Sequence, residues 1–496
     1  MPKLTLDGSL DALGLAELVR RKEVTPLELL EATLARADAL NPRLNAIVER
    51  LDERARAKAG GELPAGPFRG VPFLLKEIMG DLAGTVTTNG SCLYQGLKAE
   101  RESELVRRFE AAGLVIFGKT NVPEFGLVPI TESELHGPAH SPWALDRTPG
   151  GSSGGSGAAV AARIVPMAHA NDGGGSIRIP ASCGGLFGLK PTRSRNPFGP
   201  DRSEGWHGLV VEHALTISVR DSAALLDATA GADLGSPYFA PHQELPYAEE
   251  AAREPGRLKI GFTVGSTLGK SVHPDCIAAV KDAAALCESL GHRVEESAPP
   301  VDRQKLTRAF LVLISAELSA EVEWVATLRG RPAQAGDIEL PSWLLVNAGR
   351  RFTATELATA VVTLRAIARE QSAWFEKYDL FLTPTLTAPP VRIGELQPKP
   401  IEKLLLGLLR RFPIGSLLRK ALNELADKVG FEFAAYTPVA NITGQPAMSV
   451  PLFWNKEGLP IGAHFVGRFG AEGTLFRLAA QLERARPWAG RKPPNS

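Results

Sequence analysis

The segment from 148 to 192 constrains the fold more than any other part of this chain. It reads TPGGSSGGSGAAVAARIVPMAHANDGGGSIRIPASCGGLFGLKPT, with two clusters of glycine and serine on either side of an apolar run. Flexible glycine-rich linkers lack such apolar runs. The run GAAVAARIVPMAHA is long enough for a helix followed by a strand. The glycines are therefore expected to serve a folded backbone and not a linker.

Helices and strands alternate along the rest of the chain. The stretch 9–58 has a helical pattern and contains a capping box at Thr25–Glu28, with Pro26 at the first helical position. This alternation predicts an α/β fold. Strands are expected at 71–76, 114–120, 258–264, 293–299, 379–386, 447–452 and 461–467, a helix at 274–292, and mostly helix over 302–376.

Charge and cysteine content narrow the possible functions. The 496 residues carry 56 Lys and Arg against 55 Asp and Glu, with no long run of one sign, which argues against nucleic acid as a ligand. The four cysteines are scattered, so neither a disulfide framework nor a zinc site is predicted. The N-terminus lacks the pattern of a secretory signal, and the apolar runs fall short of the ~18 residues of a membrane span. A reducing cytoplasm is the expected compartment.

The segment 401–429 is rich in leucine with interspersed basic residues, so it has an amphipathic pattern. A pair of surface helices packed on the core is the simplest interpretation. A lid over an active site and a helix lying in a membrane interface give the same pattern. The sequence leaves these three alternatives open.

A candidate nucleophile follows three glycines in the stretch DGGGS at 172–176. Glycines allow successive backbone N–H groups to turn inward without Cβ clashes, and such a nest binds negative charge. Ser176 thus stands where an oxyanion would be bound during acyl transfer. The alternative is that Ser176 caps the following helix, which is a common role for serine.

A second serine and a lysine complete a candidate constellation. Ser152 lies at the centre of GGSSGGS, 24 residues before Ser176, and the intervening helix and strand can bring the two serines together. Lys76 ends an apolar strand, where burial would lower its pKa and allow it to act as a base; the alternative is a solvated strand end. GGSSG also fits the nucleophile elbow GxSxG, but no strand precedes it. No phosphate-loop motif is present, and the histidines form no cluster.

Several motifs together resemble the amidase signature family. They are KEIMG at 76–80, GGSSGGS at 150–156, DGGGSIRIPASCGGLFGLKPT at 172–192 and NITGQPAMSVPL at 441–452. The similarity runs from the first helical segment to the last, so it covers nearly the whole chain. It implies one amidase domain over 1–496, with a central mixed β-sheet covered by helices on both faces. Within it we expect a helical arm at 1–60, a catalytic core at 66–220 and a largely helical covering region at 300–430.

The resemblance also implies roles for individual residues. Ser176 matches the family's nucleophile, Ser152 the serine that follows a cis peptide bond, and Lys76 the base. Acylation of Ser176 would give an acyl-enzyme, and no metal or organic cofactor is implied. The oxyanion hole falls on the backbone of Gly173, Gly174, Gly175 and Ser176, and the supporting residues are Ser153, Asp172 and Arg178.

The motif wording is closest to the branch that contains the 6-aminohexanoate cyclic dimer hydrolases. It implies an amidase acting on a small-molecule amide, linear or cyclic, with carbamates and esters left open, and a homodimer as a candidate assembly. The alternative is the amidase subunit of a multiprotein tRNA-dependent amidotransferase, which usually has Gln where this chain has Ile179. The segment 193–210 is expected to line the substrate pocket with Phe198 and Trp206.

Overall fold

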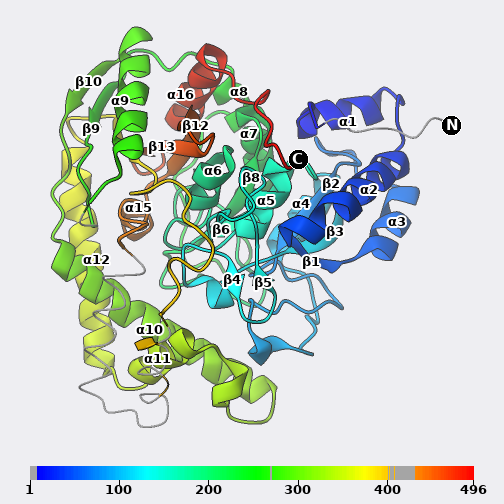
Figure 1. Cartoon of the computed structure of the whole chain (residues 1–496), viewed down its shortest axis with the longest axis horizontal. Coiled ribbons are helices and arrows are strands. Elements are labelled where there is room, and N and C mark those ends of the chain that lie inside the picture. Colours follow the sequence, from blue (N-terminus) through cyan, green and yellow to red (C-terminus); the bar gives the residue numbers. More distant parts are fainter. Residues whose placement is uncertain (1–7, 269–270, 400, 403–406, 408–430) are drawn as a thin grey trace.

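A mixed sheet of eight strands runs through the middle of the molecule (Figure 1). The computed structural model describes residues 8–268, 271–399, 401–402, 407 and 431–496. The strand order is β10-β9-β11-β13-β12-β7-β8-β6, in which β10, β9 and β11 pair in parallel and all other neighbours are antiparallel. The strands are β6 (Met167–Asp172), β7 (Phe187–Lys190), β8 (Val211–Thr216), β9 (Lys259–Phe262), β10 (Arg293–Glu296), β11 (Leu380–Pro384), β12 (Ala447–Trp454) and β13 (Pro460–Gly467).

Helices cover both faces of this sheet. Phe187 and Leu189 of β7 are buried in the same apolar core as residues of the helices on one face, whereas Gly188 between them faces the other side. A Cβ at Gly188 would lie 2.6 Å from Ala181 Cβ, so glycine allows a helix to pack directly on the strand. The first face carries α7 (Val219–Thr229), α8 (Tyr247–Ala251), α9 (Pro274–Ser289) and α16 (Glu472–Ala485), and the second carries α5 (Gly154–Ala161), α6 (Arg178–Gly184) and α15 (Thr437–Thr443). The predicted α/β fold with a covered mixed sheet is confirmed.

A second, three-stranded sheet lies in the N-terminal part, in the order β1-β3-β2. Its strands β2 (Pro72–Lys76) and β3 (Val115–Thr120) are the two apolar runs predicted from the sequence, and they pair in parallel. The third strand, β1 (Ile47–Arg50), interrupts the stretch with a helical pattern. The flanking helices are α1 (Ala12–Arg20), α2 (Pro26–Leu44), α3 (Asp52–Gly60) and α4 (Glu104–Ala111).

The end of α2 explains why the helical pattern does not continue. The predicted capping box is present at its start, where the Thr25 hydroxyl and the Glu28 carboxylate bind each other's backbone N–H groups. At its end Asn45 adopts a left-handed conformation, and the Asn41 side chain accepts the N–H groups of Ala46 and Ile47. The asparagine side chain thus replaces the helical hydrogen bonds and directs the chain into β1.

Three long helices pack beside the central sheet, at the lower left of Figure 1. Apolar residues of the first and third helix form a common core, which includes Leu306, Leu313, Leu364 and Ile367. These helices are α10 (Arg303–Leu328), α11 (Leu340–Gly349) and α12 (Ala354–Trp374). The segment 401–429 lies outside the described residues, apart from 401, 402 and 407.

The remaining described elements are short. None of the helices in the described ranges combines the length and the apolar composition that a bilayer span requires. The short elements are the 3₁₀ turns Cys92–Tyr94, Glu124–Gly126 and Ala335–Asp337 and the two-stranded pair β4 (Glu132–Ser133) and β5 (Gly137–Pro138).

Candidate active site

Lys76, Ser152 and Ser176 come from three different segments that meet beside β6. Lys76 ends β2, Ser152 lies in the loop before α5, and Ser176 lies in the loop between β6 and α6. The backbone N–H of Lys76 donates to His169 Nδ1 of β6 over 3.1 Å, which joins the small sheet to the edge of the large one. The structure therefore brings the ends of both sheets to one place.

The Lys76 amine is fully buried and lies 2.8 Å from Ser152 Oγ and 2.5 Å from Asn171 Oδ1. Burial disfavours the ammonium form and lowers the pKa of Lys76 to about 7, although the carboxylates of Glu212 and Asp172 act in the opposite direction. A substantial fraction of this lysine is therefore neutral near pH 7. A neutral amine can accept a proton from the Ser152 hydroxyl.

Polar residues of β6 hold Lys76 in position, and sequence reasoning missed most of them. Asn171 receives the lysine amine on Oδ1 and donates through Nδ2 to the Ile78 carbonyl over 3.1 Å. His169 Nε2 lies 2.6 Å from Glu212 Oε2, and because Nδ1 accepts the Lys76 N–H, the proton is assigned to Nε2. The pattern MAHAND could have indicated these two residues, because histidine and asparagine alternate with alanine and therefore point to the same face of the strand.

The Ser152 loop is closely packed. The Gly151–Ser152 peptide bond is cis, as the family resemblance implied. A Cβ at Gly151 would lie 2.6 Å from the Ile130 carbonyl oxygen, so no larger residue fits there. The hydroxyl of Ser153 lies 3.3 Å from the Asn171 carbonyl oxygen, to which it donates. The loop is thereby attached to β6, the strand whose Asn171 also binds the Lys76 amine.

The glycine loop before Ser176 has backbone donors with no partner. Gly175 has a φ of +135°, and a Cβ there would lie 2.3 Å from Thr437 Oγ1. Its N–H donates to Asp172 Oδ1 over 2.7 Å, so it is not available to a ligand. Within the described part of the chain, the N–H groups of Gly173, Gly174 and Ser176 make no hydrogen bond. Three of the four predicted oxyanion donors are therefore open.

A buried ion pair holds this loop. Arg178 binds both carboxylate oxygens of Asp172, at 3.0 and 2.9 Å. Burial alone would raise the pKa of Asp172, but the adjacent guanidinium of Arg178 outweighs it and holds this pKa far below its usual range. Asn441 donates to the Asp172 carboxylate over 2.8 Å and accepts from Arg178 over 2.7 Å. Asn441 opens the motif NITGQ, but sequence reasoning gave it no role of its own.

The hydroxyl of Ser176 makes no hydrogen bond to any described residue, and its side chain is only slightly exposed. The helix that follows begins at Arg178 with Ile177 as its N-cap and without a side-chain cap. Ser176 is therefore not a helix cap, and its oxygen faces open space.

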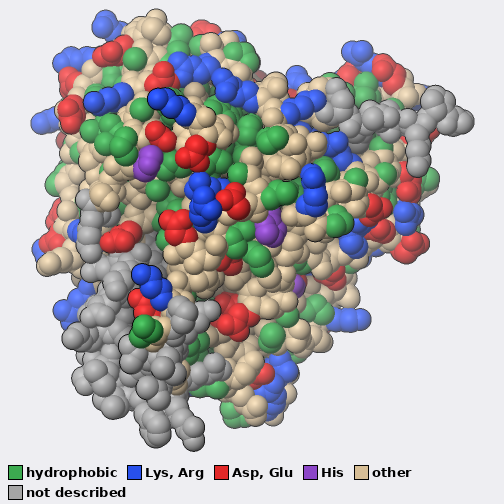
Figure 2. Space-filling model, viewed as in Figure 1, with side chains coloured by type: hydrophobic (Ala, Val, Ile, Leu, Met, Phe, Trp, Pro, Cys, Tyr) green, Lys and Arg blue, Asp and Glu red, His purple; other side chains and the backbone are tan. Residues whose placement is uncertain are grey.

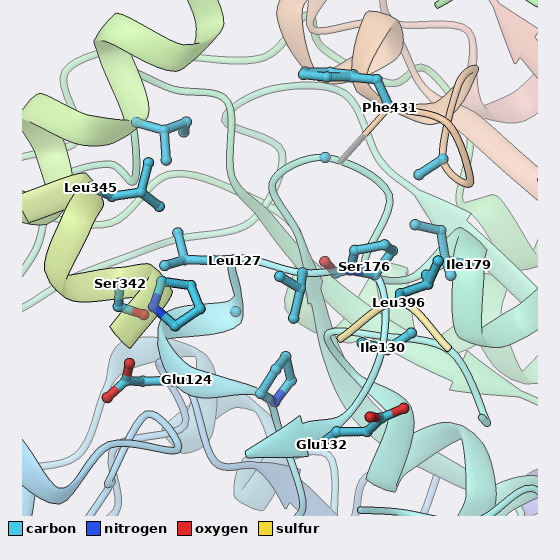
Figure 3. A pocket seen from close by; sticks show the side chains of 18 of the residues that line it. Glu124, Leu127, Ile130, Glu132, Ser176, Ile179, Ser342, Leu345, Leu396 and Phe431 are labelled. Atoms are coloured by element: carbon cyan, nitrogen blue, oxygen red, sulfur yellow. The ribbon is translucent and has the colours of Figure 1, made fainter. Parts of the chain in front are cut away.

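Two cavities meet at Ser176. The larger has a volume of about 190 Å³ and is mostly apolar (Figure 3). The smaller, of about 40 Å³, also contains Ser152 and Asn171, which the larger does not. Trp206 lines both cavities as predicted, whereas Phe198 lines two other cavities and neither of these, so its prediction is wrong. The apolar lining of the large cavity includes Leu127, Ile130, Ile179, Phe310, Ile314, Leu345 and Phe431.

Comparisons with known proteins agree with this arrangement. The Amidase family profile matches residues 28–476. The chain is 40% identical over 491 residues to the 6-aminohexanoate-cyclic-dimer hydrolase of Pseudomonas sp. (strain NK87), covering 97% of this chain and 96% of that protein. The solved structure of a 6-aminohexanoate cyclic dimer hydrolase with bound substrate superimposes with a TM-score of 0.89 at 38% identity, over 99% of this chain and 100% of that one.

A more distant similarity bears on the amidotransferase alternative. One subunit of the glutamyl-tRNA(Gln) amidotransferase of Thermotoga maritima matches with a TM-score of 0.73 and 25% identity, over 98% of this chain and 96% of that one. Both the TM-score and the sequence identity of this match are well below those of the match to the cyclic dimer hydrolase. From its motifs, its fold and these matches, the chain belongs to the amidase signature family and is an amide hydrolase.

Proposed function

We propose that the chain cleaves amides through an acyl-enzyme, with Ser176 as nucleophile, Ser152 as proton relay and Lys76 as base. One observation supports this most: the buried Lys76 amine lies 2.8 Å from Ser152 Oγ, and Ser152 lines the same small cavity as Ser176, whose hydroxyl makes no hydrogen bond to a described residue. A nucleophilic serine needs a base within reach to remove its proton. Among the described side chains that line this cavity there is no histidine, so the relay through Ser152 is the available route.

In the first half of the reaction, neutral Lys76 takes the Ser152 proton while Ser152 takes the proton of Ser176. The Ser176 oxygen attacks the amide carbonyl, and the N–H groups of Gly173, Gly174 and Ser176 stabilise the oxyanion. Gly175 contributes its backbone conformation, because its N–H is bound by Asp172. The C–N bond then breaks, Ser152 gives the leaving nitrogen the proton that it took from Ser176, and Lys76 returns its proton to Ser152.

Water completes the cycle by the same path in reverse. Water gives a proton to Ser152 while Ser152 gives its own to neutral Lys76, and the water oxygen attacks the acyl carbon. When the bond to Ser176 breaks, Ser152 returns a proton to the Ser176 oxygen and regains one from Lys76, and the acid is released. Asp172 and Arg178 touch no reacting atom in this scheme and act by holding the glycine loop. Ser153 has a similar role, because it ties the Ser152 loop to the backbone of β6.

The position of Ser152 assigns the two cavities to the two sides of the scissile bond. Ser152 delivers the proton to the leaving amine, and it lines only the smaller cavity. The leaving amine therefore occupies the smaller cavity, and the acyl group occupies the larger apolar one. Linear and cyclic amides fit this scheme, and carbamates and esters pass through a similar tetrahedral intermediate.

Replacement of Ser176 tests the proposal. Ser176→Ala should lower hydrolysis of N-hexanoyl amides and of the 6-aminohexanoate cyclic dimer by at least about 10⁴-fold, because nucleophile variants of serine hydrolases lose this much. It should also abolish labelling by a fluorophosphonate probe, with an unchanged circular dichroism spectrum. Ser289→Ala, at an exposed position of α9, is the control and should retain full activity. Residual turnover above about 1% in Ser176→Ala would exclude Ser176 as nucleophile.

We propose that the chain acts without partner proteins. The apolar Ile179, which lines the acyl cavity, stands where the amidotransferase subunit usually has glutamine. Light scattering after size exclusion gives the mass of the purified chain and distinguishes a monomer from a homodimer. Amide hydrolysis by this purified species alone supports a stand-alone enzyme, whereas activity only with added subunits would favour the amidotransferase alternative.

A further inference from the structure

The smaller cavity beside Ser176 has a polar wall that the reaction itself does not use. This wall consists of Arg202, from the loop between β7 and β8, and Glu321, from α10. Arg202 Nη2 lies 3.3 Å from Glu321 Oε1, and both side chains are partly buried. A charged pair at the place where a leaving amine would lie can select among amines.

The contacts of Glu321 leave one of its oxygens open. Oε1 accepts from Tyr94 Oη at 2.5 Å, from Asn89 Nδ2 at 3.3 Å and from Arg202. Oε2 makes no hydrogen bond to a described residue. This carboxylate is therefore held in position by one oxygen and can accept a hydrogen bond from a ligand with the other.

The guanidinium of Arg202 is held on its other side by Trp324, whose ring centroid lies 5.4 Å away. The coulombic interaction with Glu321 is the largest influence on Arg202 and raises its pKa. Arg202 is therefore neutralised by its carboxylate partner and stacked on an aromatic ring, and it presents little net positive charge to the cavity.

Other charged groups interact with this pair from outside the cavity lining. Glu317 lies 3.2 Å from His207 Nε2 and interacts with Glu321 and Arg202. Asp81 also interacts with Arg202. Among the charged side chains named here, only Glu321 and Arg202 line the cavity itself, so the open Oε2 of Glu321 is the charged atom of this wall that can bind a ligand.

From this arrangement we propose that the small cavity selects leaving amines by charge: it accepts amines whose distal group is neutral and polar or cationic, and rejects amines with a distal carboxylate. A hydroxyl or an ammonium group can donate to Glu321 Oε2, whereas a carboxylate would meet like charge. This inference rests on the proposed acyl-enzyme reaction, because that reaction assigns the small cavity to the leaving amine.

Three amides with the same acyl group test the proposal. Hexanoic acid is coupled to 2-aminoethanol, to ethylenediamine or to glycine, so that the distal group is a hydroxyl, an ammonium or a carboxylate at similar size. We expect kcat/KM for the first two to exceed that for N-hexanoylglycine by at least about tenfold, as expected for one unfavourable charge contact in a partly buried site. Glu321→Gln, which keeps an acceptor at Oε1, should reduce this ratio by about tenfold.

The test includes a control substitution on the same helix and a second variant for the case that Glu321→Gln does not fold. Glu323→Gln lies on the same helix, where its carboxylate pairs with Arg350 at the surface, and it should leave the ratio unchanged. If Glu321→Gln does not fold, Glu317→Gln should shift the ratio in the same direction. Equal kcat/KM for the three amides, a preference for the glycine amide, or no shift in a folded Glu321→Gln would overturn the proposal. Absence of all amide hydrolysis, or activity that survives Ser176→Ala, would instead overturn the proposed function.

Discussion

Burial of Lys76 disfavours its charged form, and the same burial supports its proposed role as a base. A buried ammonium without a carboxylate in contact is unfavourable, so burial at the end of β2 favours the neutral amine. Ser152 and Asn171 provide hydrogen bonds that remain possible after the proton is lost. A neutral amine is thus available near pH 7 because of where the strand ends, which supports the proposed role of Lys76 as base.

The pH dependence of acylation tests this property. Since only neutral Lys76 can accept a proton, the rate constant for acylation should rise with pH through a pKa of about 7 and level off above it. Lys76→Ala should remove this rise and lower amide hydrolysis by about 10²-fold or more, with a smaller loss for a matched ester, whose leaving group needs less help from Ser152. Single-turnover acylation of the two substrates across pH measures both effects.

Lys119 offers a matched control for the lysine. It is buried on the neighbouring strand β3, where burial also lowers its pKa, but its amine donates to Thr85 and Thr87 and not to Ser152. Lys119→Met should keep the pH midpoint of the wild type. A pH profile that is unchanged in Lys76→Ala, or altered equally in both variants, would show that Lys76 is not the base.

At the residue scale the proposed catalytic serines and lysine could be predicted from the sequence because each carries a local signal. Ser176 follows three glycines, and Lys76 ends an apolar strand. Glu212, Asn441 and Arg202 lie far from these motifs along the chain and reach the site only through tertiary contacts. Their positions depend on strand order and loop paths, which local patterns do not encode.

At the scale of elements, α15 supports the glycine loop from the far end of the sequence. Thr437 Oγ1 donates to the Gly174 carbonyl over 2.7 Å, and Asn441 donates to the backbone carbonyl of Asp172 over 2.8 Å. Both contacts fix carbonyl groups of the loop and so direct the N–H groups of the adjoining peptides. A short helix therefore helps to orient the proposed oxyanion donors.

Replacing Thr437 measures this support. Thr437→Val keeps the shape of the side chain but leaves the Gly174 carbonyl without its partner, so we expect kcat to fall about five- to tenfold with little change in KM. Thr443→Val on the same helix is the control, because its hydroxyl contacts Ala440 and Gln445 and not the loop. A change in KM alone, or equal effects of the two variants, would mean that α15 does not act through the loop.

Most elements, but not their grouping into sheets, could be predicted from sequence. The strands at 71–76 and 114–120 are present, yet they form a separate sheet with β1. An apolar run indicates that a strand is buried, but not which other strands it pairs with. The strand β1 was missed because the helical pattern around it is stronger than its own four residues, and an asparagine side chain ends the helix.

At the scale of the whole molecule, the active site lies where the central sheet meets the long helices α10 and α11. Ser176 belongs to the sheet side, whereas Phe310, Ile314 and Leu345 of the large cavity belong to these helices. The sequence predicted this region as mostly helical but could not place it against the serine. The proposed nucleophile and much of the lining of the proposed acyl cavity thus lie in different parts of the fold, so we expect changes in α10 or α11 to alter the substrate preference without contacting Ser176.

A substitution on α11 tests this separation. Figure 3 shows Leu345 on α11, apart from Ser176 across the cavity. Leu345→Phe should shorten the cavity at that end and lower kcat/KM for N-hexanoyl-2-aminoethanol about tenfold, because roughly two methylene groups lose their apolar surroundings at about 0.8 kcal/mol each. The acetyl amide does not reach that end, so its kcat/KM should change less than about twofold. Leu328→Phe, at an exposed position of α10, should affect neither substrate. Equal losses on the acetyl and hexanoyl amides would mean that the acyl group does not extend toward α11, and the assignment of the large cavity to the acyl side would then be wrong.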